Sequence, residues 1–135
     1  MTDRLEEAKK IFSNDLFATE TTGIEIQAAD VNYAKCTLKL EKKHINAIGT
    51  PMGGAIYTLA DFIFAIASNT GNVPTVTMTS EISFLKVAEG SILTGESDYM
   101  GEKGRDCFYN IDITDDRGTK VAAVKIKGRR IKKNK

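Results

Sequence analysis

The spacing of apolar residues near the N-terminus is helical. Apolar side chains recur every three or four positions, at Leu5, Ala8, Phe12 and Leu16, which would place them on one face of a helix. Gly23 then interrupts the pattern. The segment therefore predicts a short amphipathic helix before the main body of the domain.

The pattern changes to strict alternation after Gly23. Residues 24–29 and 33–41 read as two strands, and in the second the apolar side chains fall on every other position, at Ala34, Cys36, Leu38 and Leu40. Such a period of two is typical of a strand with one buried face. Residues 42–51 break the alternation and predict a loop that ends at Pro51.

Residues 52–69 are apolar over a length that only a helix explains, and Asp61 is their single charge. A helix that is apolar nearly all round is expected to be covered on most sides. One face carries bulky aliphatic side chains, namely Ile56, Leu59, Ile63 and Ile66. The other face carries small and polar ones, namely Gly54, Thr58, Asp61, Ala65 and Ser68. This second face suits the close approach of another backbone.

The rest of the chain reads as strands joined by turns, with strands expected over residues 75–87, 91–100, 106–114 and 119–131. Sequential strands with tight turns form antiparallel sheets. We therefore predict an α+β fold in which one curled antiparallel sheet wraps around a long central helix. The length of 135 residues indicates a single domain over residues 1–135.

Composition excludes several classes of site. Two cysteines stand 71 positions apart, Cys36 and Cys107, and His44 is the single histidine. These counts argue against structural zinc sites and the usual zinc hydrolases, so no metal and no cofactor are expected. The N-terminal residues lack a secretory signal pattern, and the apolar helix is too short to span a bilayer. We expect a cytoplasmic protein with reduced thiols and no membrane contact.

The net charge of +1 is unevenly distributed, because residues 120–135 hold eight Lys or Arg and no acid. Three interpretations remain open for this basic segment. It could be a nucleic-acid arm, a solvated edge strand with a frayed terminus, or the rim of a site for a nucleotide-bearing ligand. The segment alone does not choose among them.

Asp61 is the principal candidate for chemistry. A carboxylate within an apolar helix can have a structural role, in which a lysine or helix-end amides neutralise its charge. Alternatively, it is shielded from water so that it can act as an acid, a base or a nucleophile. Gly53 and Gly54 begin the same helix, where free N–H groups stabilise a negative oxygen. Gly53 precedes Asp61 by eight residues, an arrangement suited to acyl transfer.

Other polar residues are weaker candidates. His44 lies in a loop beside two lysines and is expected to be a surface or loop-packing residue rather than a catalytic base. Lys103 and Arg105 flank a glycine in a predicted hairpin and could hold a phosphate. Thr77 alternates with other threonines on one strand, which by itself indicates only a preference for extended structure.

The segment from His44 to Gly54, followed by Leu59-Ala60-Asp61, resembles the signature of hotdog-fold thioesterases of the PaaI-like, phenylacetate-pathway type. The similarity continues through residues 74–86, the Gly-Arg hairpin and the Asp-Asp-Arg-Gly turn, and covers most of residues 24–131. The resemblance implies the hotdog fold and identifies the superfamily better than the substrate.

The resemblance also implies roles for individual residues. Asp61 matches the catalytic carboxylate, which activates water or attacks the thioester directly, and Asn46 matches a residue that orients the water or the thioester. Gly53 matches the oxyanion donor. Thr77 falls where a Ser or Thr helps to hold the water. Met52, Gly54, His44, Lys103 and Arg105 are expected to contact substrate.

The same resemblance implies a homo-oligomer, either a dimer or a tetramer formed as a dimer of dimers. Its helices lie side by side, so that Asp61 faces Asn46 and Gly53 of the partner, and coenzyme A follows the subunit boundary. One position departs from the family pattern, because Met52 stands where the family usually has histidine.

Three functions follow from these observations. The leading expectation is an acyl-CoA thioesterase. The second is a hotdog protein that binds an acyl thioester without cleaving it, which Met52 favours, and the third is a nucleic-acid-binding protein with a basic arm. The acyl group, the choice between coenzyme A and acyl carrier protein, and the choice between direct attack and water activation stay open.

Overall fold

The computed structural model describes residues 3–132 and contains two α-helices, two short helical turns and six strands. The helices are α1 (Asp3–Phe12) and α2 (Gly53–Asn69), with a π-helical turn η1 (Phe17–Thr22) and a 3₁₀ turn η2 (Lys42–His44). The strands are β1 (Ile24–Asp30), β2 (Tyr33–Lys39), β3 (Thr75–Phe84), β4 (Ile92–Lys103), β5 (Asp106–Asp115) and β6 (Lys120–Arg130).

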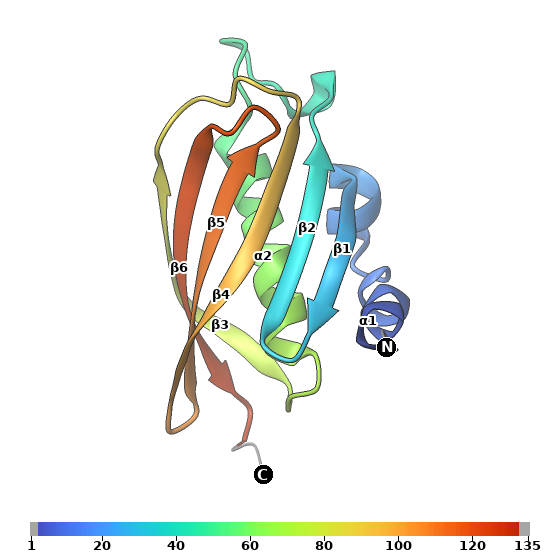
Figure 1. Cartoon of the computed structure of the whole chain (residues 1–135), viewed down its shortest axis with the longest axis vertical. Helices are drawn as coiled ribbons and strands as arrows, with labels where there is room; N and C mark the ends of the chain where they lie inside the picture. The colour runs from blue at the N-terminus through green and yellow to red at the C-terminus, as the bar shows by residue number, and fades with distance from the viewer. Residues whose placement is uncertain (1–2, 133–135) are drawn as a thin grey trace.

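All six strands form one antiparallel sheet in the order β1-β2-β4-β5-β6-β3. The sheet curls around α2, and α1 with η1 lies beside β1 at one edge (Figure 1). This is the α+β architecture that the alternating and helical segments predict. β1 and β3 are the edge strands.

The bulky stripe of α2 forms the centre of the core. Ile56, Leu59, Ile63 and Ile66 are at most 5% exposed. Two glycines of the sheet allow the helix to lie close: a Cβ on Gly95 would overlap the Ile63 side chain, and one on Gly128 would overlap the Phe64 ring. Burial of these apolar side chains is the main force that holds the sheet around α2.

The predicted N-terminal helix is interrupted. α1 ends at Phe12, and the chain re-enters a helical path only in η1, so that Leu16 and Phe17 are exposed rather than buried. Gly23 ends η1 with φ of 90°, a conformation that glycine adopts without steric cost, and its N–H donates to the Ala18 carbonyl.

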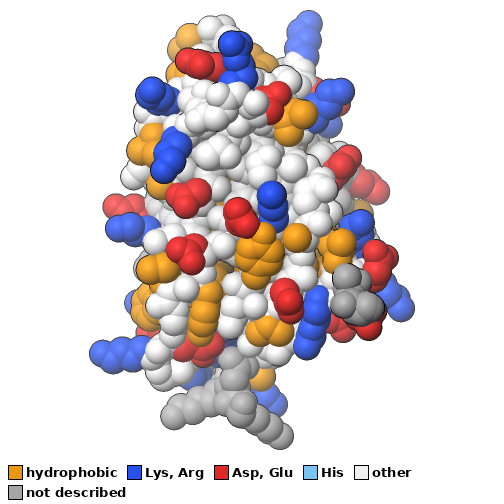
Figure 2. All heavy atoms as spheres, in the orientation of Figure 1, with side chains coloured by type: hydrophobic (Ala, Val, Ile, Leu, Met, Phe, Trp, Pro, Cys, Tyr) orange, Lys and Arg blue, Asp and Glu red, His pale blue; other side chains and the backbone are white. Residues whose placement is uncertain are grey.

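The expectation of a solvated edge strand for the basic segment is wrong. β6 lies between β5 and β3 and is paired on both sides. Arg129 forms an ion pair with Asp106, and Arg130 is fully buried. On the face of the sheet turned away from α2, basic and acidic side chains are interspersed (Figure 2). Residues 133–135 of the basic segment lie outside the described residues.

Arg130 binds the end of α2. Its guanidinium donates to the Ser68 carbonyl and, at 2.9 Å, to Thr75 Oγ1, and it pairs with Glu102 at 2.8 Å. A cation near the C-terminal end of a helix is stabilised by the helix dipole and by the unpaired carbonyls there. Arg130 is therefore a structural residue.

The edge strand β3 exposes apolar side chains. Val76 and Met78 are about half exposed, and so is Phe84 at the end of the strand. An open edge with apolar side chains is a template for pairing with another chain.

Among the described residues, no helix is long and apolar enough to cross a membrane.

Candidate active site

The N-terminus of α2 presents free N–H groups. Met52 occupies the N-cap position in an extended conformation without a capping side-chain hydrogen bond, and its carbonyl accepts from Ala55 and Ile56 at 3.0 and 3.2 Å. Gly53 and Gly54 find no backbone acceptor among the described residues. These two N–H groups, together with the helix dipole, can therefore bind a negative oxygen.

Asn46 shapes the loop that leads to this helix. Its Oδ1 accepts from the backbone N–H of Ile48, Gly49 and Thr50 at 3.0–3.1 Å, and its Nδ2 donates to Thr50 Oγ1 at 3.0 Å. Gly49 has a φ of 100°, which closes this turn at little steric cost. Asn46 thus fixes the turn before the helix tip, and its amide oxygen is fully engaged.

His44 lies beneath the loop and is 5% exposed. Its Nδ1 accepts from the Glu41 N–H at 2.9 Å, so its Nε2 carries the proton and donates to the Thr22 carbonyl at 2.7 Å. Both ring nitrogens are engaged within the chain, which favours the loop-packing interpretation over contact with substrate.

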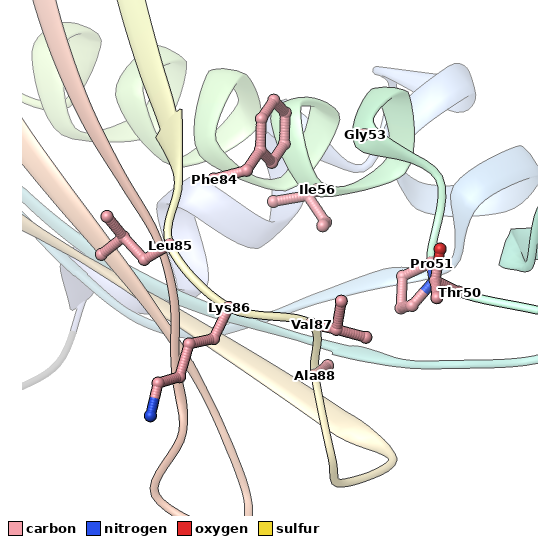
Figure 3. A pocket seen from close by; sticks show the side chains of 9 residues that line it. All are labelled: Thr50, Pro51, Gly53, Ile56, Phe84, Leu85, Lys86, Val87 and Ala88. Carbon is pink, nitrogen blue, oxygen red and sulfur yellow. The ribbon is translucent and has the colours of Figure 1, made fainter.

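A hollow of about 490 Å³ opens beside the helix tip. Figure 3 shows Phe84 and Ile56 near Gly53, with Pro51 and Val87 across the opening and Lys86 pointing away from these apolar groups. We call it the helix-tip hollow; it is lined by Thr50, Pro51, Gly53, Ile56, Phe84, Leu85, Lys86, Val87 and Ala88. Its size and mostly apolar wall suit a small organic ligand.

Gly53 sets the width of this hollow, because a Cβ there would lie 3.1 Å from the ring of Phe84. The helix tip and the end of β3 therefore touch at this point. Gly54 is different, because a Cβ there would meet no atom of the chain within 4 Å. Its backbone is open to a ligand or to another molecule.

Asp61 is exposed in the single chain, so the helix and sheet of this chain alone do not shield it from water. The carboxylate forms no hydrogen bond or ion pair among residues 3–132, and so no lysine neutralises it. Protein surrounds the carboxyl sufficiently for desolvation to raise the pKa of Asp61, and the negative charge of Asp15 raises it further. A raised pKa makes the carboxylate a stronger base.

The small stripe of α2 is the face that the sheet leaves uncovered. Gly54 and Asp61 are exposed, and Thr58 and Ala65 are half-buried. Ser68, which the sequence placed on the same stripe, is instead fully buried and donates to the Phe64 carbonyl at 2.7 Å. The uncovered stripe therefore stops one turn earlier than expected.

Gly53 and Asp61 do not converge within one chain. Eight residues of helix separate them, which is about 12 Å along the axis. An oxygen bound at the helix tip is therefore out of reach of the Asp61 carboxylate of the same chain.

Three other candidates also lie away from the helix tip. Thr77 is exposed on β3, seven residues before Phe84 and therefore about 23 Å along the strand. Lys103 and Arg105 lie in the β4–β5 hairpin, at the end of the sheet opposite the start of α2 (Figure 1). Arg105 donates to the Ile131 carbonyl at 2.9 Å. One chain does not bring these residues together with Gly53.

Sequence reasoning missed the wall of the helix-tip hollow. Phe84 and Lys86 end the strand predicted over residues 75–87, and only the pairing of β3 with β6 places that end beside α2. The available signal was the apolar run Phe84-Leu85 followed by a lysine, at a point where the strand pattern ends.

No cluster of three potential metal ligands occurs among residues 3–132.

Comparison with known proteins confirms the resemblance. A family profile described as Domain of unknown function (DUF4442) matches residues 8–129. The acyl-coenzyme A thioesterase PaaI of Escherichia coli is 28% identical over 127 residues, which cover 93% of this chain and 90% of PaaI. A protein of Archaeoglobus fulgidus named a putative esterase is 30% identical over 94 residues, 69% of this chain and 61% of that protein.

Solved structures confirm the hotdog fold. The E. coli PaaI structure superposes with a TM-score of 0.88 at 22% identity, covering 98% of this chain and 97% of that one. A hypothetical thioesterase of Streptococcus pneumoniae, solved with coenzyme A, superposes with a TM-score of 0.79 at 24% identity, covering 90% and 98%.

Proposed function

The chain belongs to the family described as Domain of unknown function (DUF4442), and from its similarity to the acyl-coenzyme A thioesterase PaaI and the geometry of its helix tip we propose that it is an acyl-CoA thioesterase. Such an enzyme hydrolyses a thioester to a free acid and coenzyme A. The observation that supports this proposal most strongly is the helix tip itself: the N–H groups of Gly53 and Gly54 have no backbone acceptor among the described residues, and Gly53 lines a mostly apolar hollow.

The helix tip is suited to activate a thioester carbonyl. With the carbonyl oxygen at the Gly53 N–H, the helix dipole and the N–H stabilise the negative charge that develops when the carbon is attacked. The acyl group then lies in the helix-tip hollow, where Phe84 and Ile56 supply an apolar wall. Met52, half exposed at the N-cap next to Gly53, offers a flexible apolar side chain that a bound acyl group could contact.

Asp61 supplies the second requirement, a nucleophile or base. Its carboxylate either removes a proton from an attacking water or attacks the carbonyl carbon itself, and in both cases the carbon–sulfur bond breaks. In the water route, the proton taken up by Asp61 passes to the departing sulfur. In the direct route, the sulfur leaves as a thiolate and takes up a proton from water. Its raised pKa favours either role. In the direct route, water then hydrolyses the resulting anhydride.

The separation of Gly53 and Asp61 requires a second copy of the chain. Two α2 helices packed antiparallel along the stripe of Gly54, Thr58, Asp61 and Ala65 would bring Asp61 of one copy to the helix tip of the other. The stripe is uncovered and small enough for close approach, and the neighbouring β3 edge is open and apolar. We therefore propose a homodimer with two sites at its interface, which can pair again into a tetramer.

The remaining candidates take positioning roles in this arrangement. Asn46 fixes the turn before the helix tip and has one N–H of its amide left to orient the thioester or the water. Thr77, exposed on the β3 edge, would help to hold the water from the partner's side of the interface. The open backbone at Gly54 would admit the thioester arm.

A non-catalytic acyl-CoA-binding protein is the second candidate function. Met52 favours it, because an apolar side chain stands where the family usually has a histidine that can donate a hydrogen bond. The two functions share the binding geometry and differ only in turnover.

Thiol release from short, medium, long and aromatic acyl-CoAs separates these functions. We expect wild type to hydrolyse at least one of these classes, and Asp61→Asn to retain binding while losing most turnover. Asp112→Asn, the same change at an exposed position on β5, is the matched control and should hydrolyse at the wild-type rate. Thermal melting of each variant checks the fold.

Binding of acyl-CoA without hydrolysis of any class would establish the non-catalytic function instead. Wild-type turnover by a well-folded Asp61→Asn protein would remove Asp61 from the mechanism.

A further inference from the structure

A second hollow adjoins the helix-tip hollow and shares two of its residues, Leu85 and Lys86. It has a volume of about 460 Å³ and lies between the β3–β4 loop and the β5–β6 turn. We call it the basic hollow, because Lys86, Arg117 and Lys120 line it. A ligand that leaves the helix-tip hollow along Lys86 enters it directly.

The cations of the basic hollow are available to a ligand. Lys86, Arg117 and Lys120 form no ion pair among the described residues, and Glu89 is the acidic residue that lines the hollow with them. Two further acids in the β5–β6 turn, Asp115 and Asp116, accept hydrogen bonds from backbone N–H groups instead. The charged residues that line the hollow are three cations and one acid, so its lining carries a net charge of +2 that an anion can match.

Asp115 and Asp116 hold the two walls of the basic hollow together. Asp115 accepts from the N–H groups of Glu89, Gly90, Arg117 and Thr119 at 2.7–2.9 Å, and Asp116 accepts from Ser91 and Ile92 at 2.9 and 3.2 Å. Burial alone would raise the pKa of Asp115, but these donors lower it overall. Asp115 therefore stays ionised, and the walls that bear the cations keep their spacing.

The order of the two hollows matches the chemistry of a coenzyme A thioester. Such a molecule carries its acyl group and thioester at one end, and its negatively charged phosphates at the other end beyond the uncharged pantetheine arm. The apolar hollow lies at the helix tip, and the basic hollow lies beyond Lys86, whose side chain points away from the apolar wall (Figure 3). The Lys103–Arg105 hairpin lies at the opposite end of the same chain (Figure 1).

We propose that Lys86, Arg117 and Lys120 form the subsite that binds the phosphate groups of the coenzyme A thioester. This inference rests on the proposed function for the identity of the ligand. It replaces the hairpin residues Lys103 and Arg105 with a cluster that is continuous with the helix-tip hollow of the same chain.

The test compares a thioester that has the phosphates with one that lacks them. The same acyl group is presented as acyl-CoA and as acyl-pantetheine to wild type and to the Arg117→Gln/Lys120→Gln variant. We expect kcat/KM for acyl-CoA to fall about tenfold or more, mainly through KM, because two charge-assisted contacts are lost. The value for acyl-pantetheine should not change.

Lys125→Gln is the matched control for Lys120→Gln, because Lys125 is exposed on the same strand and the change in charge is equal. It should leave both substrates unaffected. An equal loss for acyl-CoA and acyl-pantetheine, or no loss for either, would overturn the proposal. So would a selective loss for acyl-CoA that appears only in Lys103→Gln/Arg105→Gln.

Direct binding separates this proposal from the proposed function. If wild type hydrolyses no thioester, the thioesterase assignment fails, and calorimetric titration with coenzyme A then tests the subsite alone. Weaker binding of coenzyme A by Arg117→Gln/Lys120→Gln than by wild type supports the subsite. Equal binding by both proteins, or none by wild type, overturns it.

Discussion

At the scale of single residues, the site depends on what Gly53 lacks. It has no side chain that would push Phe84 out of the helix-tip hollow, and its N–H has no acceptor in the described part of the chain. Any other residue would narrow the hollow. Glycine at this position therefore serves both the shape of the site and its electrostatics.

Gly53→Pro removes the proposed oxyanion donor with little change to the fold. Gly53 is the first residue of α2 and Met52 before it is extended, with φ of −65° and ψ of 136°, which are conditions that proline tolerates. We expect kcat to fall about 100- to 1,000-fold, the usual effect of losing one donor. Steady-state hydrolysis of the preferred acyl-CoA measures this.

Gly53→Ala is the control, because it makes the same contact with Phe84 and keeps the N–H. It should retain most of the activity that Gly53→Pro loses. An equal fall in kcat in the two variants would show that the absence of a side chain at residue 53, and not its N–H group, is what catalysis requires.

Asp15→Asn should change the pH profile. The negative charge of Asp15 adds to desolvation in raising the pKa of Asp61, so its removal lowers that pKa. Because the ionised carboxylate is the active form, the acid limb of kcat/KM against pH should move to lower pH while the plateau persists. An unchanged acid limb, or one that moves to higher pH, would contradict this assignment.

The sequence identified Asp61, Gly53 and Asn46 as candidates, but it did not reveal their surroundings. The apolar neighbours of Asp61 along the chain suggested burial, whereas the helix turns this residue toward solvent. The sequence did not decide whether His44 packs in the loop or contacts substrate. The hydrogen-bond partners of its two ring nitrogens favour packing. Contacts between residues distant in sequence decide such cases, and local pattern does not report them.

At the scale of elements, the pattern of apolar and polar residues predicted where the strands lie in the sequence, but it did not predict which strands pair with each other in the sheet. Alternation identified β2 because a period of two follows from the strand itself. The position of β6 inside the sheet follows from its pairing with β3, which joins residues from Thr75↔Arg130 to Phe84↔Ala122. A basic composition therefore suggested an edge strand where the fold has a central one.

Arg130→Met should destabilise the domain. The change removes a buried cation from Glu102 and from the Ser68 carbonyl at the end of α2, and each lost hydrogen bond of a charged group costs about 1.5–3 kcal/mol. Urea unfolding should show this loss. Arg130→Met/Glu102→Gln should be less destabilised than Arg130→Met, since no unpaired carboxylate remains; an equal or larger loss would show that the pair does not matter.

The N-terminal region shows the same limit of local pattern. The helical spacing of apolar residues continues to Leu16 and predicted one helix, yet α1 ends at Phe12 and η1 follows. This interruption brings Asp15 close enough to Asp61 to influence its pKa. A uniform helix was the simplest prediction from spacing, and packing against α2 replaced it.

At the scale of the whole molecule, one chain forms only half of the proposed site. About 12 Å of helix separates Gly53 from Asp61, and the stripe between them is uncovered. The hotdog fold and the long helix could be predicted from the sequence. The incompleteness of the single-chain site could not, because it depends on which face of α2 the sheet covers.

The proposed chemistry therefore needs two chains: Asp61 of one copy acts on a thioester held at Gly53 of the other. Mixing subunits tests this claim directly. Asp61→Ala and Gly53→Pro chains, each inactive alone, are unfolded together in equal amounts and refolded into mixed dimers, and acyl-CoA hydrolysis is measured.

Half of the randomly paired dimers would then be mixed, and each mixed dimer would contain one intact site, so about a quarter of wild-type activity should return. If Asp61 and Gly53 of the same chain acted together, every site in the mixture would be defective. No recovery of activity, with mixed dimers shown to be present, would contradict the account.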